Sequence, residues 1–206
     1  MRKPTEYDAI VIGASAGGLQ ALSSILSALP EKYTLPVIIV QHRAKEEKDL
    51  LENILQQKCR IKIKQADEKE LITSGRVYFA PANYHLLVER NRTFSLSSDE
   101  TVNYSRPSID VLFETAAEVY EKRLVAIVLT GSNNDGANGV KVVRSQGGLT
   151  IVQNPGEAQY PAMPVASIGT GAVNHIFMLK EIQQFLIQLS KNEGHEESKE
   201  IHNPAR

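Results

Sequence analysis

The sequence predicts an α/β domain with a doubly wound, mostly parallel sheet, helices on both faces of that sheet and one antiparallel hairpin. Short, almost continuous apolar runs, typical of strands that are covered on both faces, recur along the chain. Several are followed by apolar residues at the three- and four-residue spacing of a helix. We expect this domain to span residues 1–190 and a polar, flexible tail to form residues 191–206.

The first half of the chain predicts a strand, a helix and a parallel strand. Tyr7–Gly13 is an apolar run that ends in glycines, and helical spacing follows from Gly17 to Leu29. Leu35–Val40 is the next buried strand, which a right-handed crossover places beside the first. A charged amphipathic helix is predicted at Lys45–Gln57, with residues 50, 51, 54 and 55 facing inward. A half-exposed strand is predicted at Arg60–Gln65.

The middle of the chain has a different pattern. Three short runs, Arg76–Ala80, His85–Glu89 and Thr93–Leu96, are separated by turn-forming proline and asparagine, which predicts an antiparallel hairpin appended to the parallel sheet. Pro107 suits the first turn of a helix over Ile109–Lys122. The inner face of that helix is predicted to hold Val111, Leu112, Thr115, Ala116 and Val119.

The last part of the chain returns to alternating strands and helices. Buried strands are predicted at Leu124–Leu129 and Thr150–Val152. The helices are predicted from Gly136 through Arg144, from Pro161 to Gly169 and from Lys180 to Leu189.

The composition excludes several classes of protein. With 23 Lys and Arg against 24 Asp and Glu, the net charge of −1 provides no basic surface for nucleic acid. No apolar run approaches the ~20 residues that span a bilayer, and the polar start of the chain is unlike a signal peptide. The single Cys59 cannot form an intramolecular disulfide. We therefore expect a cytoplasmic protein that neither binds nucleic acid nor inserts into a membrane.

Three residues that follow predicted strands could form a catalytic site. In doubly wound sheets, ligands bind at the carboxyl ends of the parallel strands. Ser15 follows the first strand, His42 follows the second, and Asp135 lies in the loop after Leu124–Leu129. A hydroxyl, an imidazole and a carboxylate at one rim are the groups of a nucleophile, a general base and an orienting residue.

Each of these residues also has a simpler interpretation. Ser15 could be the N-cap of the following helix, and Asp135 could belong to a turn or cap a helix. His42 could be an ordinary surface or core histidine. The chain order Ser, His, Asp differs from that of the α/β-hydrolases, so we expect neither their fold nor their lid.

The glycine-rich loop does not match a nucleotide site. Ser15 stands where a dinucleotide fingerprint has its second glycine, and Gln41 and His42 stand where it has an acidic residue. A Walker loop is also excluded, because no Gly-Lys-Ser/Thr follows. The other histidines lack ligand spacing, so we predict no metal site and no cofactor; they are His85 in a strand, His175 in a loop, and His195 and His202 in the tail.

Six motifs, in register from about Tyr7 to Leu189, are Ile12–Gly18, Gln41-His42, Tyr78–Pro81, Arg106–Phe113, Leu129–Gly131 with Asn134–Ala137, and Met163-Pro164. In these motifs the sequence resembles the catalytic domain of the chemotaxis protein-glutamate methylesterases, the CheB family. The resemblance implies a serine esterase that hydrolyses γ-glutamyl methyl esters on chemoreceptor helices, releases methanol and in many members also deamidates glutamines. It assigns Ser15 as nucleophile, His42 as base and then acid, and Asp135 as the carboxylate that fixes the imidazole tautomer.

The sequence departs from the family pattern at the expected oxyanion and substrate pocket, which we place at Ala16, Gly17, Ser132 and Asn133. The family usually has threonine in place of Ala16 and Met-Gly in place of Ser132-Asn133. If backbone amides form the pocket, these changes are tolerable, since asparagine best replaces a glycine whose φ must be positive. If a threonine hydroxyl contributes, activity is lower.

The departures leave a second class of function open, in which the domain is a regulatory or partner-binding module with little or no activity. Family members usually carry an N-terminal receiver domain, whereas here the first strand is predicted within a few residues of Met1. We therefore expect a domain without a receiver. The resemblance implies methylated chemoreceptor signalling helices as partners, and it leaves open a separate receiver domain or a methyltransferase as a further partner.

Overall fold

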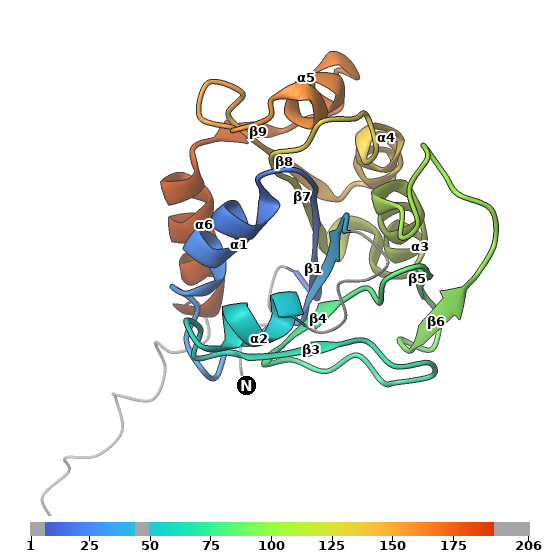
Figure 1. Ribbon diagram of the computed structural model, residues 1–206, viewed down its shortest axis with the longest axis vertical. Coiled ribbons are helices and arrows are strands. Elements are labelled where there is room, and N and C mark those ends of the chain that lie inside the picture. Colours follow the sequence, from blue (N-terminus) through green and yellow to red (C-terminus); the bar gives the residue numbers. More distant parts are fainter. Residues whose placement is uncertain (1–6, 44–49, 192–206) are drawn as a thin grey trace, which may run out of the picture.

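A parallel sheet of seven strands forms the centre of the computed structural model, which describes residues 7–43 and 50–191 (Figure 1). The strand order is β3-β4-β2-β1-β7-β8-β9, and every pairing is parallel. Its strands are β1 (Ala9–Ala14), β2 (Val37–Gln41), β3 (Lys62–Gln65), β4 (Arg76–Phe79), β7 (Leu124–Val128), β8 (Leu149–Gln153) and β9 (His175–Phe177). The predicted α/β fold with a doubly wound sheet is confirmed.

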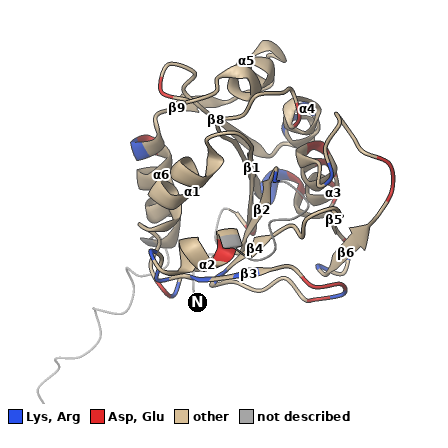
Figure 2. Ribbon diagram, in the orientation of Figure 1, with Lys and Arg blue, Asp and Glu red and all other residues tan. Residues whose placement is uncertain are grey.

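Helices cover both faces of this sheet. They are α1 (Gly18–Leu26), α2 (Leu50–Gln56), α3 (Ile109–Tyr120), α4 (Ala137–Ser145), α5 (Ala162–Gly169) and α6 (Leu179–Lys191), with a 3-10 turn, η1, at Glu121–Arg123. Helices α1, α2 and α6 lie on one face of the sheet and α3, α4 and α5 on the other (Figure 1). The apolar side chains of each group form a core with the face that they cover. This double coverage explains why β1, β2, β7 and β8 carry no charged residue (Figure 2).

The prediction for the middle of the chain was partly wrong. Arg76–Phe79 is β4, which lies in the main sheet between β2 and β3 and is parallel to both. Only β5 (His85–Val88) and β6 (Phe94–Ser97) pair in antiparallel fashion, and they form a separate two-stranded sheet. Local turn residues cannot distinguish these arrangements, because the pairing of β4 is decided by strands that lie far away in the sequence.

Three further predictions need correction. Pro107 precedes the N-cap Ser108 rather than lying in the first turn of α3. The buried face of α3 includes Ile109, Asp110 and Phe113, whereas Val111, Thr115 and Val119 are only partly buried. His175 lies in the edge strand β9 instead of a loop, in a run too short for its pattern to indicate a strand. The first residues of the predicted helix Lys45–Gln57 and the tail beyond Lys191 lie outside the described residues.

The approach of α3 to α4 depends on the absence of a side chain at Gly139. A Cβ atom there would lie 2.5 Å from the Cβ of Phe113 on α3. We therefore expect Gly139→Ala to lower the free energy of unfolding by about 1–3 kcal/mol, because overpacking forces the two helices apart. Urea unfolding measures the change, with Gly169→Ala in α5 as the control, because a Cβ there meets no atom within 4 Å. Equal effects of the two substitutions would contradict the prediction.

Within the described residues, no helix combines the length and the apolar composition that crossing a bilayer requires.

Candidate active site

The three predicted site residues follow three adjacent central strands. In the sheet order β2-β1-β7, His42 follows β2, Ser15 follows β1, and Asp135 lies in the loop after β7. The helix after β1 covers one face of the sheet and the helix after β7 covers the other, so this edge is the switch point of the fold. The register places Ala14 opposite Gln41 and Gly13 opposite Val128, which brings the three loops to one level.

Ser15 lies in the tight turn between β1 and α1. The N-cap of α1 is Gly17, with φ 77°, and no side chain caps that helix. The interpretation of Ser15 as a helix cap is therefore wrong. Its Oγ instead lies 3.2 Å from Nδ1 of His42. Gly131 lies against this turn, where a Cβ would overlap the Sδ of the buried Met163 and approach the Cβ of Ser15 to 2.9 Å.

His42 connects the serine to the carboxylate. Its Nε2 lies 2.8 Å from Oδ2 of Asp135, and its side chain is only 13% exposed. Because an ionised carboxylate can only accept a hydrogen bond, Nε2 carries the proton, and the neutral ring presents its lone pair at Nδ1, toward Ser15. The ring thus has the tautomer that a general base for Ser15 requires.

Asp135 is fully buried, and its carboxylate accepts hydrogen bonds from several donors. Its Oδ2 accepts the amide of Ile109 at 2.7 Å as well as the His42 bond, and its Oδ1 accepts the amide of Asp110 at 3.1 Å and the hydroxyl of Ser108 at 2.8 Å. The carboxylate therefore lies at the N-terminus of α3, where the helix dipole stabilises negative charge. Asp135 does not cap α4, the helix that follows it, because the N-cap of α4 is Gly136 and no side chain bonds there.

A second buried carboxylate, Asp110, lies beside Asp135 and was not identified from the sequence. Its Oδ1 accepts the amide of Gly139 at 2.7 Å, and its Oδ2 accepts Nδ2 of Asn103 at 2.8 Å. The same Nδ2 lies 3.3 Å from Oδ1 of Asp135, so Asn103 bridges the two acids. Asp110 occurs in the first turn of a predicted helix, where an acidic residue is common, and no local pattern distinguished it.

The two carboxyls have opposite pKa shifts. Burial raises the pKa of Asp135, but the bonds from His42 and from the Ile109 amide outweigh it, so its pKa lies below the usual value. Burial raises the pKa of Asp110, and the charge of Asp135 acts in the same direction, while the Gly139 amide opposes both. On acidification, Asp110 should therefore become protonated before Asp135 does.

These shifts predict opposite effects of acid on stability. The lowered pKa of Asp135 gives a stabilisation that is present above its ordinary value of 3.8 and is lost as the pH falls through the folded-state pKa. The destabilisation caused by Asp135→Asn should therefore shrink between pH 7 and pH 3. Because the pKa of Asp110 is raised, the wild type should gain stability relative to Asp110→Asn over the same change. Urea unfolding at several pH values tests both signs, and parallel pH curves for all three proteins would refute them.

The four residues expected at the oxyanion pocket, Ala16, Gly17, Ser132 and Asn133, differ from one another in exposure and in hydrogen bonding. Within the described residues, the amides of Ala16 and Gly17 donate no hydrogen bond, so both are available to a ligand. Ser132 is exposed. Asn133 has no positive φ, which corrects the idea that it replaces a glycine for that reason. Its Oδ1 instead accepts the amide of Asp135 at 3.1 Å.

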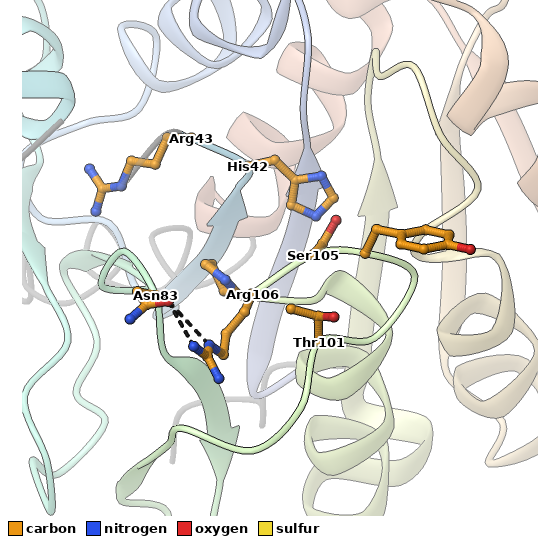
Figure 3. Close-up of a pocket in the computed structure, with 8 residues that line it drawn as sticks. His42, Arg43, Asn83, Thr101, Ser105 and Arg106 are labelled. Carbon is orange, nitrogen blue, oxygen red and sulfur yellow. Dashed lines mark hydrogen bonds between the residues drawn. The ribbon is translucent and has the colours of Figure 1, made fainter. Parts of the chain in front are cut away.

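A pocket of about 270 Å³ opens beside His42 (Figure 3). It is lined by His42, Arg43, Asn83, Thr101, Tyr104, Ser105, Arg106 and Pro107. Arg106 is bound to Oδ1 of Asn83 and to the carbonyl oxygens of Ser98 and Asp99, which fixes the loop that forms one wall. The side chain of Tyr104 is fully exposed at the rim. The pocket therefore connects the side chain of His42 to solvent.

The two other histidines in the described residues, His85 and His175, have local partners of their own. Buried His85 accepts the amide of Ser108 at Nδ1 and contacts the carbonyl of Glu100 through Nε2, which accounts for both ring nitrogens. His175 stacks on Phe177 in β9. Across residues 7–43 and 50–191, no group of three His, Cys, Asp or Glu side chains has the geometry of a metal site.

Comparison with known proteins identifies the family of this chain. The family model described as CheB methylesterase matches residues 10–186. The chain belongs to the CheB methylesterase family. A solved structure titled as the CheB methylesterase catalytic domain of Thermotoga maritima superposes with a TM-score of 0.85 at 30% identity, over 89% of this chain and 98% of that one.

Named CheB-type relatives differ in length. A Leptospira interrogans protein named putative protein-glutamate methylesterase/protein-glutamine glutaminase is 50% identical over 186 residues, which are 90% of this chain and 96% of the relative. A Borreliella burgdorferi protein named probable protein-glutamate methylesterase is 33% identical, over 89% of this chain and 50% of the relative. The chain thus spans nearly all of the first relative and about half of the second.

Proposed function

We propose that this protein hydrolyses the methyl esters of glutamate side chains in chemoreceptors, with Ser15 as nucleophile, His42 as general base and acid, and Asp135 as the orienting carboxylate. The observation that carries the proposal is the unbroken line of contacts from Ser15 through His42 to Asp135, in a chain of the CheB family. The names of the relatives supply the substrate class.

The contacts support a two-step acyl transfer. Ser15 Oγ attacks the ester carbonyl carbon and passes its proton to Nδ1 of His42, while the free amides of Ala16 and Gly17 stabilise the oxyanion. The protonated imidazole then gives its proton to the departing methoxide, which leaves as methanol. Water attacks the acyl-enzyme with His42 again as base, which releases the glutamate carboxylate and restores Ser15.

The two ring nitrogens of His42 have the reverse of their roles in serine proteases of the chymotrypsin type, where Nε2 faces the serine and Nδ1 faces the aspartate. Here Nδ1 faces Ser15 and Nε2 faces Asp135. The chemistry needs only one nitrogen to accept a proton and the other to donate to a carboxylate, so either arrangement performs it.

Deamidation of glutamine is a second candidate activity of the same site. Relatives are named protein-glutamine glutaminases as well as methylesterases. A glutamine side chain would pass through the same acyl-enzyme, with ammonia in place of methanol as the leaving group. The pocket beside His42 offers space for parts of the receptor next to the reacting side chain.

Methanol release from methylated chemoreceptor tests the proposal. The full chain should release methanol, and a fluorophosphonate should modify Ser15 and stop the reaction, because the same nucleophile attacks both reagents. A folded chain that binds the receptor but neither releases methanol nor reacts with the probe would favour the regulatory module instead. Equal turnover by Ser15→Ala would contradict the assigned nucleophile.

A further inference from the structure

Gln41, the last residue of β2, contacts the main chain of both the serine and the histidine. Its Nε2 donates one hydrogen bond to the carbonyl oxygen of Ser15 and another to the carbonyl oxygen of His42, each at 2.8 Å. One amide group therefore joins the residue that follows β1 to the residue that follows β2. Gln41 is 8% exposed, and it is not among the residues of the pocket beside His42.

The packing around Gln41 leaves its amide little freedom. A Cβ atom at Gly18, the first residue of α1, would overlap Oε1 of Gln41 and come 2.9 Å from its Cδ. The glycine thus makes room for this amide between the end of β2 and the start of α1. The amide of Gly18 also donates to the Ser15 carbonyl at 2.9 Å, so that carbonyl receives two donors.

The direction of the Ser15 carbonyl also determines the direction of the next amide. In a trans peptide, the C=O of Ser15 and the N–H of Ala16 point in opposite directions. By holding the Ser15 carbonyl, Gln41 therefore also fixes the direction of the Ala16 amide, which the proposed mechanism assigns to the oxyanion. Within the part of the chain that the structure describes, that amide has no other acceptor.

We propose that Gln41 is a positioning residue, which sets the separation of Ser15 from His42 and the direction of the Ala16 amide without touching the substrate. The proposal rests on the proposed function. The strand ladder fixes only the start of each loop, through the bond from the His42 amide to the Ala14 carbonyl at 3.0 Å. Gln41 holds the carbonyl groups of Ser15 and His42, which lie one step further along each loop.

The test is the reactivity of Ser15 in Gln41→Met, which keeps the length of the side chain and removes both N–H donors. We expect kcat for methanol release and the rate of labelling by a dialkyl fluorophosphate each to fall by about 10- to 100-fold, because small displacements of reacting groups are costly. KM should change little, since Gln41 makes no proposed substrate contact. Gln41→Asn, whose amide is one methylene too short to reach both carbonyls, should lower the same two rates.

Gln56 provides a matched control. Its Nε2 also joins two carbonyl oxygens, those of Cys59 at 3.0 Å and Ile61 at 3.2 Å, and its Oε1 accepts the amide of Ile63. Gln56→Met therefore removes at least as many hydrogen bonds, but in α2 and away from Ser15. It should lower the melting temperature while leaving the labelling rate near that of the wild type, when both are measured below the melting temperature.

The outcomes separate this proposal from the proposed function. Failure of the wild type to become labelled at Ser15 would overturn the function. Labelling of the wild type together with an unchanged rate in either folded Gln41 variant would overturn the positioning role. Equal losses of labelling rate in the Gln56 and Gln41 variants would also overturn it, because general destabilisation would then account for the effect.

Discussion

Replacing Ser15 with alanine should reduce methyl ester hydrolysis by roughly 10⁴- to 10⁶-fold, and His42→Ala should cause a loss of similar size, as in other enzymes with such a unit. The double variant should lose little more than either single variant. The reason is that Ser15 Oγ and His42 Nδ1 act as one unit across 3.2 Å, so the nucleophile is not activated once either is removed.

Measurement of kcat for the four proteins tests this non-additivity, with Ser27→Ala as the control. Ser27 is an exposed serine just after α1, and its hydroxyl bonds only the local carbonyl of Ser24 among the described residues. The control should retain wild-type activity. Losses that multiply in the double variant would show that Ser15 and His42 act independently and would contradict their assignment as nucleophile and base.

Asp135→Asn should lower kcat by about 10³- to 10⁴-fold, as the loss of the orienting carboxylate does in serine proteases. An amide group in this place can donate to Nε2 of His42, which favours the proton on Nδ1 and removes the acceptor from Ser15. One of its oxygens is also replaced by a donor opposite the amides at the start of α3. KM should change less than kcat, because Asp135 is fully buried.

The matched control is Asp67→Asn, which alters an exposed carboxylate. Asp67 pairs with Lys64 of β3, the strand at one edge of the sheet. It should leave kcat unchanged. NMR of the His42 ring adds a second observation, since the wild type should carry its proton on Nε2 and the Asp135 variant on Nδ1. A fully active Asp135→Asn protein would exclude the orienting role.

Local patterns were sufficient to predict most elements of the fold, because buried strands and amphipathic helices have distinct periodicities. The strands β1, β2 and β7 are continuous apolar runs, a pattern that predicts strands covered on both faces. The place of β4 could not be predicted in this way, because Arg76–Phe79 pairs with two strands that no turn links to it directly. Strand β9 has three residues and no pattern of its own.

The candidate site followed from the rule that ligands lie at the ends of parallel strands, which selects residues by position as well as by chemistry. The same rule gives no information about the side chains that hold the three site residues in place. Asp110, Asn103 and Ser108 surround Asp135 because the start of α3 reaches that carboxylate, a long-range contact that the sequence does not encode locally. Gln41 was identified as part of a motif, but its bonds to two loops became apparent only in the structure.

The position of the three site residues on adjacent central strands links catalysis to the most protected part of the molecule. β2, β1 and β7 have neighbours on both sides, and their amides should exchange with solvent only when the whole domain opens. Many enzymes lose activity first through a mobile segment, below the temperature at which they melt. In the proposed mechanism, Ser15, His42 and Asp135 should stay together until the centre of the sheet comes apart, so thermal inactivation and cooperative unfolding should be a single event.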